Sequence, residues 1–168
     1  MRAAPWIFAI CLLLSGCAGY QLGPTNGSVA GSKSIQITPF SSKALEPRLS
    51  DAVTSQLRKS IQKDGTYRLN TSGDPDIVVT GTIETYDRRQ LSFQPTDILT
   101  PRDYRIILVA RVVARERSTG KTILDRDVSG RTTVRIGSDL SSAERQALPL
   151  AAEDLARSIT SLLADGTW

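Results

Sequence analysis

The side chains that most often carry out catalysis are scarce in this chain. Its 168 residues include no histidine and only two cysteines, Cys11 and Cys17. Without histidine, Ser–His and Cys–His nucleophile pairs cannot form, and the commonest metal ligand is missing. The sequence Gly120-Lys121-Thr122 resembles the end of a phosphate-binding loop, but it lacks the upstream glycine and the following helix. We therefore expect no catalytic residues, no metal site and no cofactor, and we expect that the protein is not an enzyme.

Two carboxylates on one predicted strand are the remaining candidates for acid–base chemistry. Asp125 and Asp127 lie two residues apart, so in a strand their side chains share a face. There they could form ion pairs with Arg131 or Arg135 across a hairpin. We interpret this pattern as a solvated strand face and not as a catalytic pair.

Four arginines flank a predicted loop between two strands: Arg88, Arg89, Arg102 and Arg105. If the strands pair as a hairpin, all four gather at one end of the sheet. Arginine binds phosphate through two parallel hydrogen bonds, so such a cluster could hold an anionic glycolipid. The alternative is a solubilising edge in which Asp87 and Asp103 are the local ion-pair partners.

The N-terminal residues follow the layout of an export signal. Arg2 supplies a positive charge, and the apolar run Trp6–Leu14 is too short for the roughly 20 residues of a membrane-spanning helix. The sequence Leu14-Ser15-Gly16-Cys17 resembles the lipobox, whose cysteine is acylated and becomes the first residue of the mature protein. We expect residues 1–16 to be a lipoprotein signal peptide and Cys17 to carry the lipid. The alternative is an ordinary secretory signal with an incidental cysteine.

Removal of this signal would leave 152 residues (168 minus 16) without any disulfide, enough for one hydrophobic core. Residues 17–33 are then the acylated cysteine and a tether, and residues 34–168 form a single domain. The formal net charge of +4 suits an anionic partner such as phosphate-bearing lipid. With 5% aromatic residues and no basic block, nucleic acid is not an expected partner.

The apolar pattern predicts the order strand, helix, strand, strand, strand, helix. The predicted strands are 34–40, 77–86, 104–114 and 122–136, with an exposed loop or an extended hairpin tip over 90–102. Leu49, Val53, Leu57 and Ile61 form one apolar stripe on the first helix, which Asp64-Gly65 ends.

The second helix is expected to close the chain. Ser141 and Glu144 fit a capping box, and the regular helix is expected to begin near Pro149 and to end at Asp165-Gly166. Two helices with one apolar stripe each must cover one face of a sheet. The predicted fold is therefore an α+β two-layer sandwich with a mixed four-stranded sheet.

The first residues after the predicted cleavage site resemble the mature start of a known family. The sequence Cys17-Ala18-Gly19-Tyr20-Gln21-Leu22-Gly23 is similar to that of the lipopolysaccharide-assembly lipoproteins, the LptE family, which commonly begin with Cys-Gly-Tyr and a leucine; Ala18 is an insertion in that pattern. The order of elements, the strand that begins Arg102-Asp103-Tyr104-Arg105 and the closing helix near Trp168 extend the resemblance over the mature chain.

The resemblance implies a non-enzymatic lipoprotein, anchored by acyl chains such as palmitate at the periplasmic face of the outer membrane. Members of that family plug a large outer-membrane β-barrel, help it to assemble, and bind lipopolysaccharide on its way to the cell surface. Ala18, in place of an acidic residue after the cysteine, resembles lipoproteins that are sorted to the outer membrane. The four arginines are the proposed contact with lipopolysaccharide, on geometric grounds alone.

Two other functions remain open at this point. The chain could be an auxiliary periplasmic lipoprotein of an envelope lipid transporter or of another envelope-assembly complex. It could also be an enzyme that acts on envelope glycans or lipids, but the absence of histidine and of a free thiol in the mature chain counts strongly against that function.

Overall fold

The computed structural model describes residues 29–46, 48–95, 97–135 and 139–166. The predicted signal peptide, Cys17 and most of the predicted tether lie outside these residues. In chain order the elements are β1 (Lys33–Ile37), β2 (Ser41–Ser42), α2 (Leu49–Asp64), β3 (Tyr67–Leu69), β4 (Ile77–Gln94), β5 (Asp97–Glu116), β6 (Thr122–Arg135) and α3 (Leu140–Asp165).

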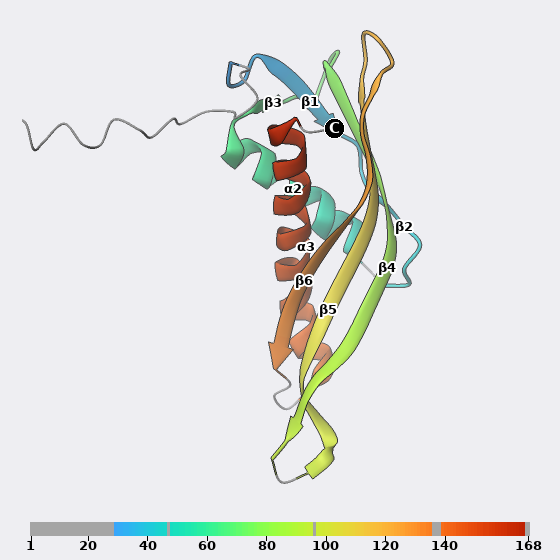
Figure 1. The fold of residues 1–168 in the computed structure, drawn as a ribbon, viewed down its shortest axis with the longest axis vertical. Coiled ribbons are helices and arrows are strands. Elements are labelled where there is room, and N and C mark those ends of the chain that lie inside the picture. The colour runs from blue at the N-terminus through green and yellow to red at the C-terminus, as the bar shows by residue number, and fades with distance from the viewer. Residues whose placement is uncertain (1–28, 47, 96, 136–138, 167–168) are drawn as a thin grey trace, which may run out of the picture.

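The strands form one mixed sheet in the order β3-β1-β4-β5-β6, and the short β2 lies beside β4 in line with β1. Strand β1 runs parallel to β3 and β4, whereas β4, β5 and β6 are antiparallel. Both helices cover the same face of this curved sheet (Figure 1). The predicted α+β two-layer architecture is confirmed, but the count of four strands is wrong. Strands β2 and β3 have only two and three residues, too few to show an alternating pattern.

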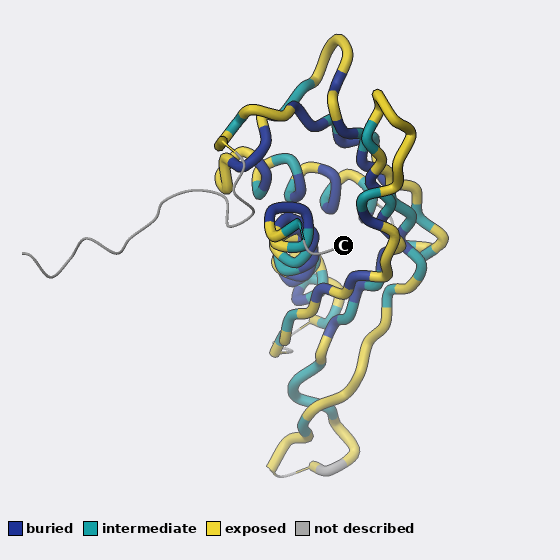
Figure 2. Tube along the Cα trace, turned by 45° about the horizontal axis from the view of Figure 1, so that its top comes forward, coloured by how far each residue is buried: buried dark blue, intermediate teal, exposed yellow. Residues whose placement is uncertain are grey.

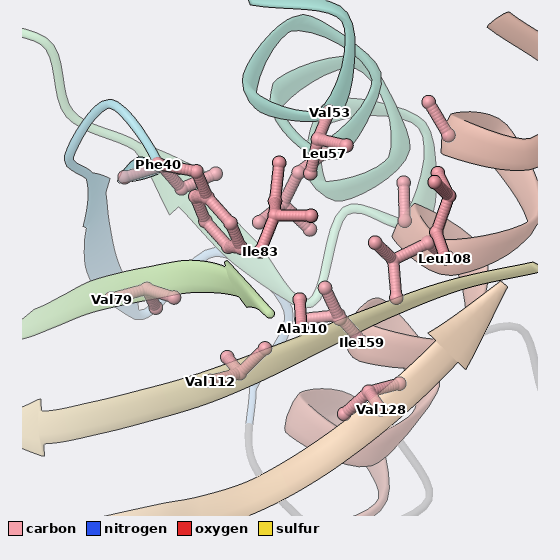
Figure 3. Close-up of a cluster of buried hydrophobic side chains, with 14 of the residues drawn as sticks. Phe40, Val53, Leu57, Val79, Ile83, Leu108, Ala110, Val112, Val128 and Ile159 are labelled. Atoms are coloured by element: carbon pink, nitrogen blue, oxygen red, sulfur yellow. The ribbon is translucent and has the colours of Figure 1, made fainter. Parts of the chain in front are cut away.

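The hydrophobic core lies between the sheet and the two helices (Figure 3). Alternate residues of β5 face the helices and are fully buried: Ile106, Leu108, Ala110, Val112 and Ala114. The stripe predicted on α2 is confirmed, since all four of its residues are buried. The helix ends as predicted at Gly65, whose positive φ of 77° lets its amide donate to the carbonyl of Ile61.

Helix α3 begins earlier than the sequence predicted. The side chain of Asp139 accepts hydrogen bonds from the amides of Ser141 (3.1 Å) and Ser142 (2.9 Å), so Asp139 and not Ser141 is the N-cap. Pro149 lies inside the helix, which starts at Leu140. The first turns pack against the rest of the protein through the buried Ala143 and Ala147, and this packing offsets the hydrogen bond that the proline removes.

Strands β4 and β5 continue far beyond their predicted ends and form the extended hairpin that was one of two alternatives for residues 90–102. The hairpin runs past the ends of both helices (Figure 1), and its far end is mostly exposed on both faces (Figure 2). A strand that is exposed on both faces has no buried side to impose an apolar alternation. This is why residues 87–103 carried no strand signal.

Helix α3 crosses β6 at a glycine, which allows the two elements to approach closely. A Cβ atom placed on Gly130 would lie 2.4 Å from the backbone nitrogen of Leu155 and 2.6 Å from the carbonyl oxygen of Ala151. Both are backbone atoms of a regular helix, so they cannot move aside as a flexible side chain could. In addition, the amide of Arg131 donates to the carboxylate of Asp154 on α3 (2.9 Å), which ties the edge strand to the helix.

We predict that Gly130→Ala lowers the free energy of unfolding by about 1–3 kcal/mol, because α3 must shift away from β6. Urea unfolding followed by circular dichroism measures this change. The matched control is Ser129→Ala, the exposed neighbour on the same strand, which should change stability by less than about 0.5 kcal/mol. Equal unfolding midpoints for the two variants would contradict the close contact.

Candidate functional site on the β4–β5 hairpin

The hairpin brings the four predicted arginines to the same end of the sheet. In the register of β4 and β5, Arg89 lies directly opposite Arg105, and Arg88 lies opposite Ile106. Arg102 is three residues before Arg105 on β5. The strands therefore pair as the sequence analysis supposed, and the arginines become neighbours through this pairing.

The alternation of side chains along the strands divides this cluster between two faces. Ile106 is fully buried beneath the helices, so its cross-strand neighbour Arg88 lies on the helix-covered side. There the Nη1 atom of Arg88 is 2.7 Å from Oε1 of Glu144 on α3. This hydrogen bond, with the charge of Glu144, raises the pKa of Arg88. Its ion-pair partner is thus Glu144, and not Asp87 as the solubilising-edge alternative supposed.

Arg89 and Arg105 lie on the opposite, outer face of the sheet, which no helix covers. Two arginines of β6 share this face. Arg131 lies opposite Ile107 in the register, and Arg135 lies opposite Asp103. We call Arg89, Arg105, Arg131 and Arg135 the outer basic patch. Among the described residues, the guanidinium groups of the first three have no ion-pair or hydrogen-bond partner.

Two acidic residues share this part of the outer face: Asp87, opposite Ile107, and Asp103, opposite Arg135. Asp103 accepts a hydrogen bond from the hydroxyl of Ser92 (2.5 Å) and another from Nε of Arg135 (3.1 Å). Both bonds lower the pKa of the Asp103 carboxyl, and the bond from Ser92 has the larger effect. The carboxyl therefore stays ionised near neutral pH. Since Asp103 is engaged by Arg135, it does not neutralise the facing pair Arg89 and Arg105.

Asp125 and Asp127 form ion pairs with a different arginine from those expected. Arg111 on β5 contacts Asp125 (2.7 Å) and Asp127 (3.3 Å), so the predicted pairing with Arg131 or Arg135 is wrong. Asp127 lies directly opposite Arg111 in the register. Arg131, by contrast, is four residues further along the same strand as Asp127, about 13 Å away. All three groups are largely exposed, in agreement with a solvated strand face.

Arg131 and Arg135 are the members of the patch that sequence reasoning missed. Both were considered only as partners for the aspartates. The signal that could have found them is their spacing of four on β6, which places both on one face. Which face that is, and which residues of β5 they meet, depends on the β5–β6 register.

Exposed apolar side chains continue beyond the arginines to the end of the hairpin. Leu91 and Phe93 on β4 are 42% and 45% exposed, and Leu99 on β5 is 84% exposed. A cationic patch next to an apolar tip matches a ligand that carries both negative charge and hydrocarbon. Within the described residues, no group of side chains could hold a metal ion, and none of the helices is long and apolar enough to cross a membrane.

Several solved structures of bacterial proteins share this fold. A protein from Xanthomonas campestris has a TM-score of 0.56 at 10% identity, with 86% of this chain and 92% of that chain covered. A minor lipoprotein from Acinetobacter baumannii has a TM-score of 0.51 at 16% identity, covering 79% and 92%. The PelC dodecamer from Paraburkholderia phytofirmans has a TM-score of 0.50 at 16% identity, covering 84% and 92%. At these identities the likeness concerns the fold alone.

No curated protein matches the chain. A family model does, however: the model for LptE, described as lipopolysaccharide-assembly, matches residues 32–163, which include every helix and strand described above. Proteins of that family are non-enzymatic, envelope-associated lipoproteins that act with an outer-membrane lipopolysaccharide-assembly protein. The predicted resemblance and the expectation of a non-enzymatic protein are thus confirmed, and the chain belongs to the LptE family of lipopolysaccharide-assembly lipoproteins.

Proposed function

We propose that this protein is anchored through Cys17 at the periplasmic face of the outer membrane, plugs a large β-barrel, and assists the passage of lipopolysaccharide to the cell surface. In this proposal the arginines at the β4–β5 hairpin hold the phosphate groups of the lipid. The observation that carries it is the direct opposition of Arg89 and Arg105 on the open face of the sheet.

Like charges directly opposite one another on neighbouring strands destabilise a sheet. A protein that keeps such a pair gains from it when an anion lies between the two cations. Arginine suits this role because its planar guanidinium donates two parallel hydrogen bonds to one phosphate. Arg131 adds a third cation on the same face, whereas Arg88 is held by Glu144 on the other. We therefore assign the main phosphate contacts to Arg89 and Arg105. Arg102 lies three residues from Arg105, at a shift in the β4–β5 register, and is assigned no direct contact.

The outer face of the sheet also suits the interior of a barrel, whose wall is polar. This face carries the Arg111–Asp125–Asp127 ion pairs and the outer basic patch, and no helix covers it. Polar groups on such a surface can exchange water for the hydrogen-bonding groups of a lumen wall. The exposed apolar tip at Leu91, Phe93 and Leu99 would then meet acyl chains or an apolar part of the barrel.

The proposed anchor has enough chain to reach such a position. Two or three acyl chains on Cys17 hold a protein stably to a membrane, whereas one short chain does so only marginally. The 17 residues from Cys17 to Lys33 span at most about 55 Å when fully extended. The domain can therefore stand away from the inner leaflet while its lipid remains inserted.

We predict that Cys17→Ser removes the anchor. Cells that produce the native chain and are fed labelled palmitate should incorporate label into it, and the variant should incorporate none and leave the membrane fraction. The control is Cys11→Ser, which changes the other cysteine and should leave labelling intact. Labelling of the Cys17→Ser variant would contradict lipidation at this residue.

The partner is tested by a mild-detergent pull-down of the lipidated protein with a C-terminal tag, followed by mass spectrometry. We expect an outer-membrane β-barrel in stoichiometric amount that is retained through washing. Recovery of inner-membrane transporter subunits, or of no barrel, would contradict the plug and favour the alternative of an auxiliary lipoprotein of an envelope lipid transporter or another envelope-assembly complex.

The phosphate contacts are tested by replacing Arg89 and Arg105 together with glutamine. Because charge-assisted hydrogen bonds are each worth about 1.5–3 kcal/mol, we expect lipopolysaccharide to bind at least about tenfold more weakly. The same variant should unfold at equal or higher urea concentration, since the repulsion between the two cations is gone. Arg126→Gln, an exposed arginine of β6 outside the patch, is the control and should bind normally. Unchanged lipid binding by the double variant would exclude these arginines as the site.

A further inference from the structure

Strand β4 has a free edge along its second half. On the side of β4 away from β5, the line of β1 and β2 ends at Ser42, which is paired with Ile83. The amide of Lys43 makes one more bond, to the carbonyl of Ile83 (2.9 Å), and the chain then departs towards α2. From Thr85 to Gln94, no backbone group of β4 is hydrogen-bonded to a described residue on that side.

The direction of the free backbone groups follows from the register. The carbonyls of Val79 and Ile83 point to this edge, because they accept from the amides of Thr38 and Lys43. Glu84 is an extra residue in β4, as the shift between the pairs Ile83–Ala110 and Thr85–Val109 shows. Beyond this bulge the alternation is reset by one residue. The N–H and C=O groups of Tyr86, Arg88 and Gln90 therefore point outward along the free edge.

The surroundings of this edge are those of an unfilled strand position. A cavity of about 460 Å³ lies where the chain leaves the sheet, between residues 44–46 and residues 84–88 of β4. Leu45 is fully exposed at one end of the edge, and Leu91 and Phe93 are exposed at the other. Long edges of this kind can pair with another chain. Residues 44–46 lie across the cavity from the first half of the edge, and no hydrogen bond joins these described residues to its backbone.

We propose that this edge pairs antiparallel with the same edge of a second copy of the chain, over residues 85–91, with the twofold axis at Arg88. Any twofold register centred on a residue brings the outward-pointing residues of two copies opposite one another, and the three nearest the middle of the edge are centred on residue 87, 88 or 89. Centring on 87 opposes Asp87 to Asp87 of the second copy, and centring on 89 opposes Arg89 to Arg89. Only the register centred on Arg88 places Asp87 opposite Arg89, twice over by symmetry.

The charges at the centre are compatible with this register. The two Arg88 residues meet at the axis, but each is already paired with Glu144 of its own chain at 2.7 Å, on the helix-covered side. Asp87 and Arg89 lie on the outer face and have no ion-pair partner among the described residues of their own chain. The pairing thus forms an ion pair between Asp87 and Arg89 twice, and it joins the sheets of both copies into one. This inference rests on the fold and its charges and not on the proposed function. Since it engages Arg89 with Asp87, it concerns the chain outside a barrel and without bound phosphate.

Charge reversal tests the register. The lipidated protein in mild detergent is examined by sedimentation velocity over a range of concentrations, and we expect a reversible dimer. Asp87→Arg and Arg89→Asp should each weaken the dimer about tenfold, because like charges then face each other at two places. The double variant, which exchanges the two charges, should restore it. Arg126→Asp on β6 is the control and should dimerise as the native chain does.

Cross-linking supplies a second measurement, which does not depend on how much the charge reversals weaken the dimer. In the proposed register the two copies of residue 88 form a hydrogen-bonded pair, with a Cα separation of about 5.5 Å that a disulfide can bridge. Arg88→Cys should therefore form a dimer under mild oxidation, and Ser129→Cys on the opposite edge of the sheet should not. Circular dichroism checks that both variants fold. A native chain that stays monomeric, a double variant that is not restored, or cross-linking at Ser129→Cys in place of Arg88→Cys would each overturn the proposal.

Discussion

The burial of one face of β5 against two helices is the constraint on which the remaining structure depends. Strand β5 has a neighbour on each side, and its helix-facing residues from Ile106 to Ala114 are fully buried. A shift of one residue would expose this whole row and bury Arg111, which lies between two of its members, so the register is strongly determined. Helix α3 is held over the row by its approach to Gly130, and α2 packs against α3 and the parallel strands. The outer face is consequently left for charged groups.

The extra residue in β4, Glu84, determines which arginines face the helices and which face the open side of the sheet. Before Glu84, the odd-numbered residues Ile77, Val79 and Ile83 face the helices; after it, Tyr86 and Arg88 do. Without the bulge, Arg89 would lie under α3 and Arg88 would lie on the open face. With it, Arg88 reaches Glu144, and burial raises the pKa of the nearby Tyr86 to about 12. A local irregularity of the backbone thus creates the facing pair Arg89 and Arg105 on the open side.

The hairpin and the core obey different requirements. The core is held by apolar burial, and its residues are determined by packing. The hairpin extends beyond the helices, so packing does not determine its side chains. It carries cations in facing positions and apolar groups at its tip, and one of its edges has no neighbouring strand. In the isolated protein each of these features lowers stability or solubility, and contact with another molecule removes this penalty. This is the region to which the proposed function assigns the contacts with lipid and barrel.

The sequence by itself determined the types of the longer elements, the apolar stripe of α2, the helix stops at Gly65 and Gly166, and the family. These features are local or periodic, and they can be read from neighbouring residues. The tertiary structure alone decided the short strands β2 and β3, the start of α3 at Asp139, the length of the hairpin, and the partner of Asp125 and Asp127. Except for the start of α3, where Asp139 accepts from the nearby Ser141 and Ser142, each of these depends on a contact between segments far apart in the chain. The division of the four arginines between two faces has the same cause, because a strand's alternation fixes which side chains share a face, and only its pairing with the other strands decides which face is buried.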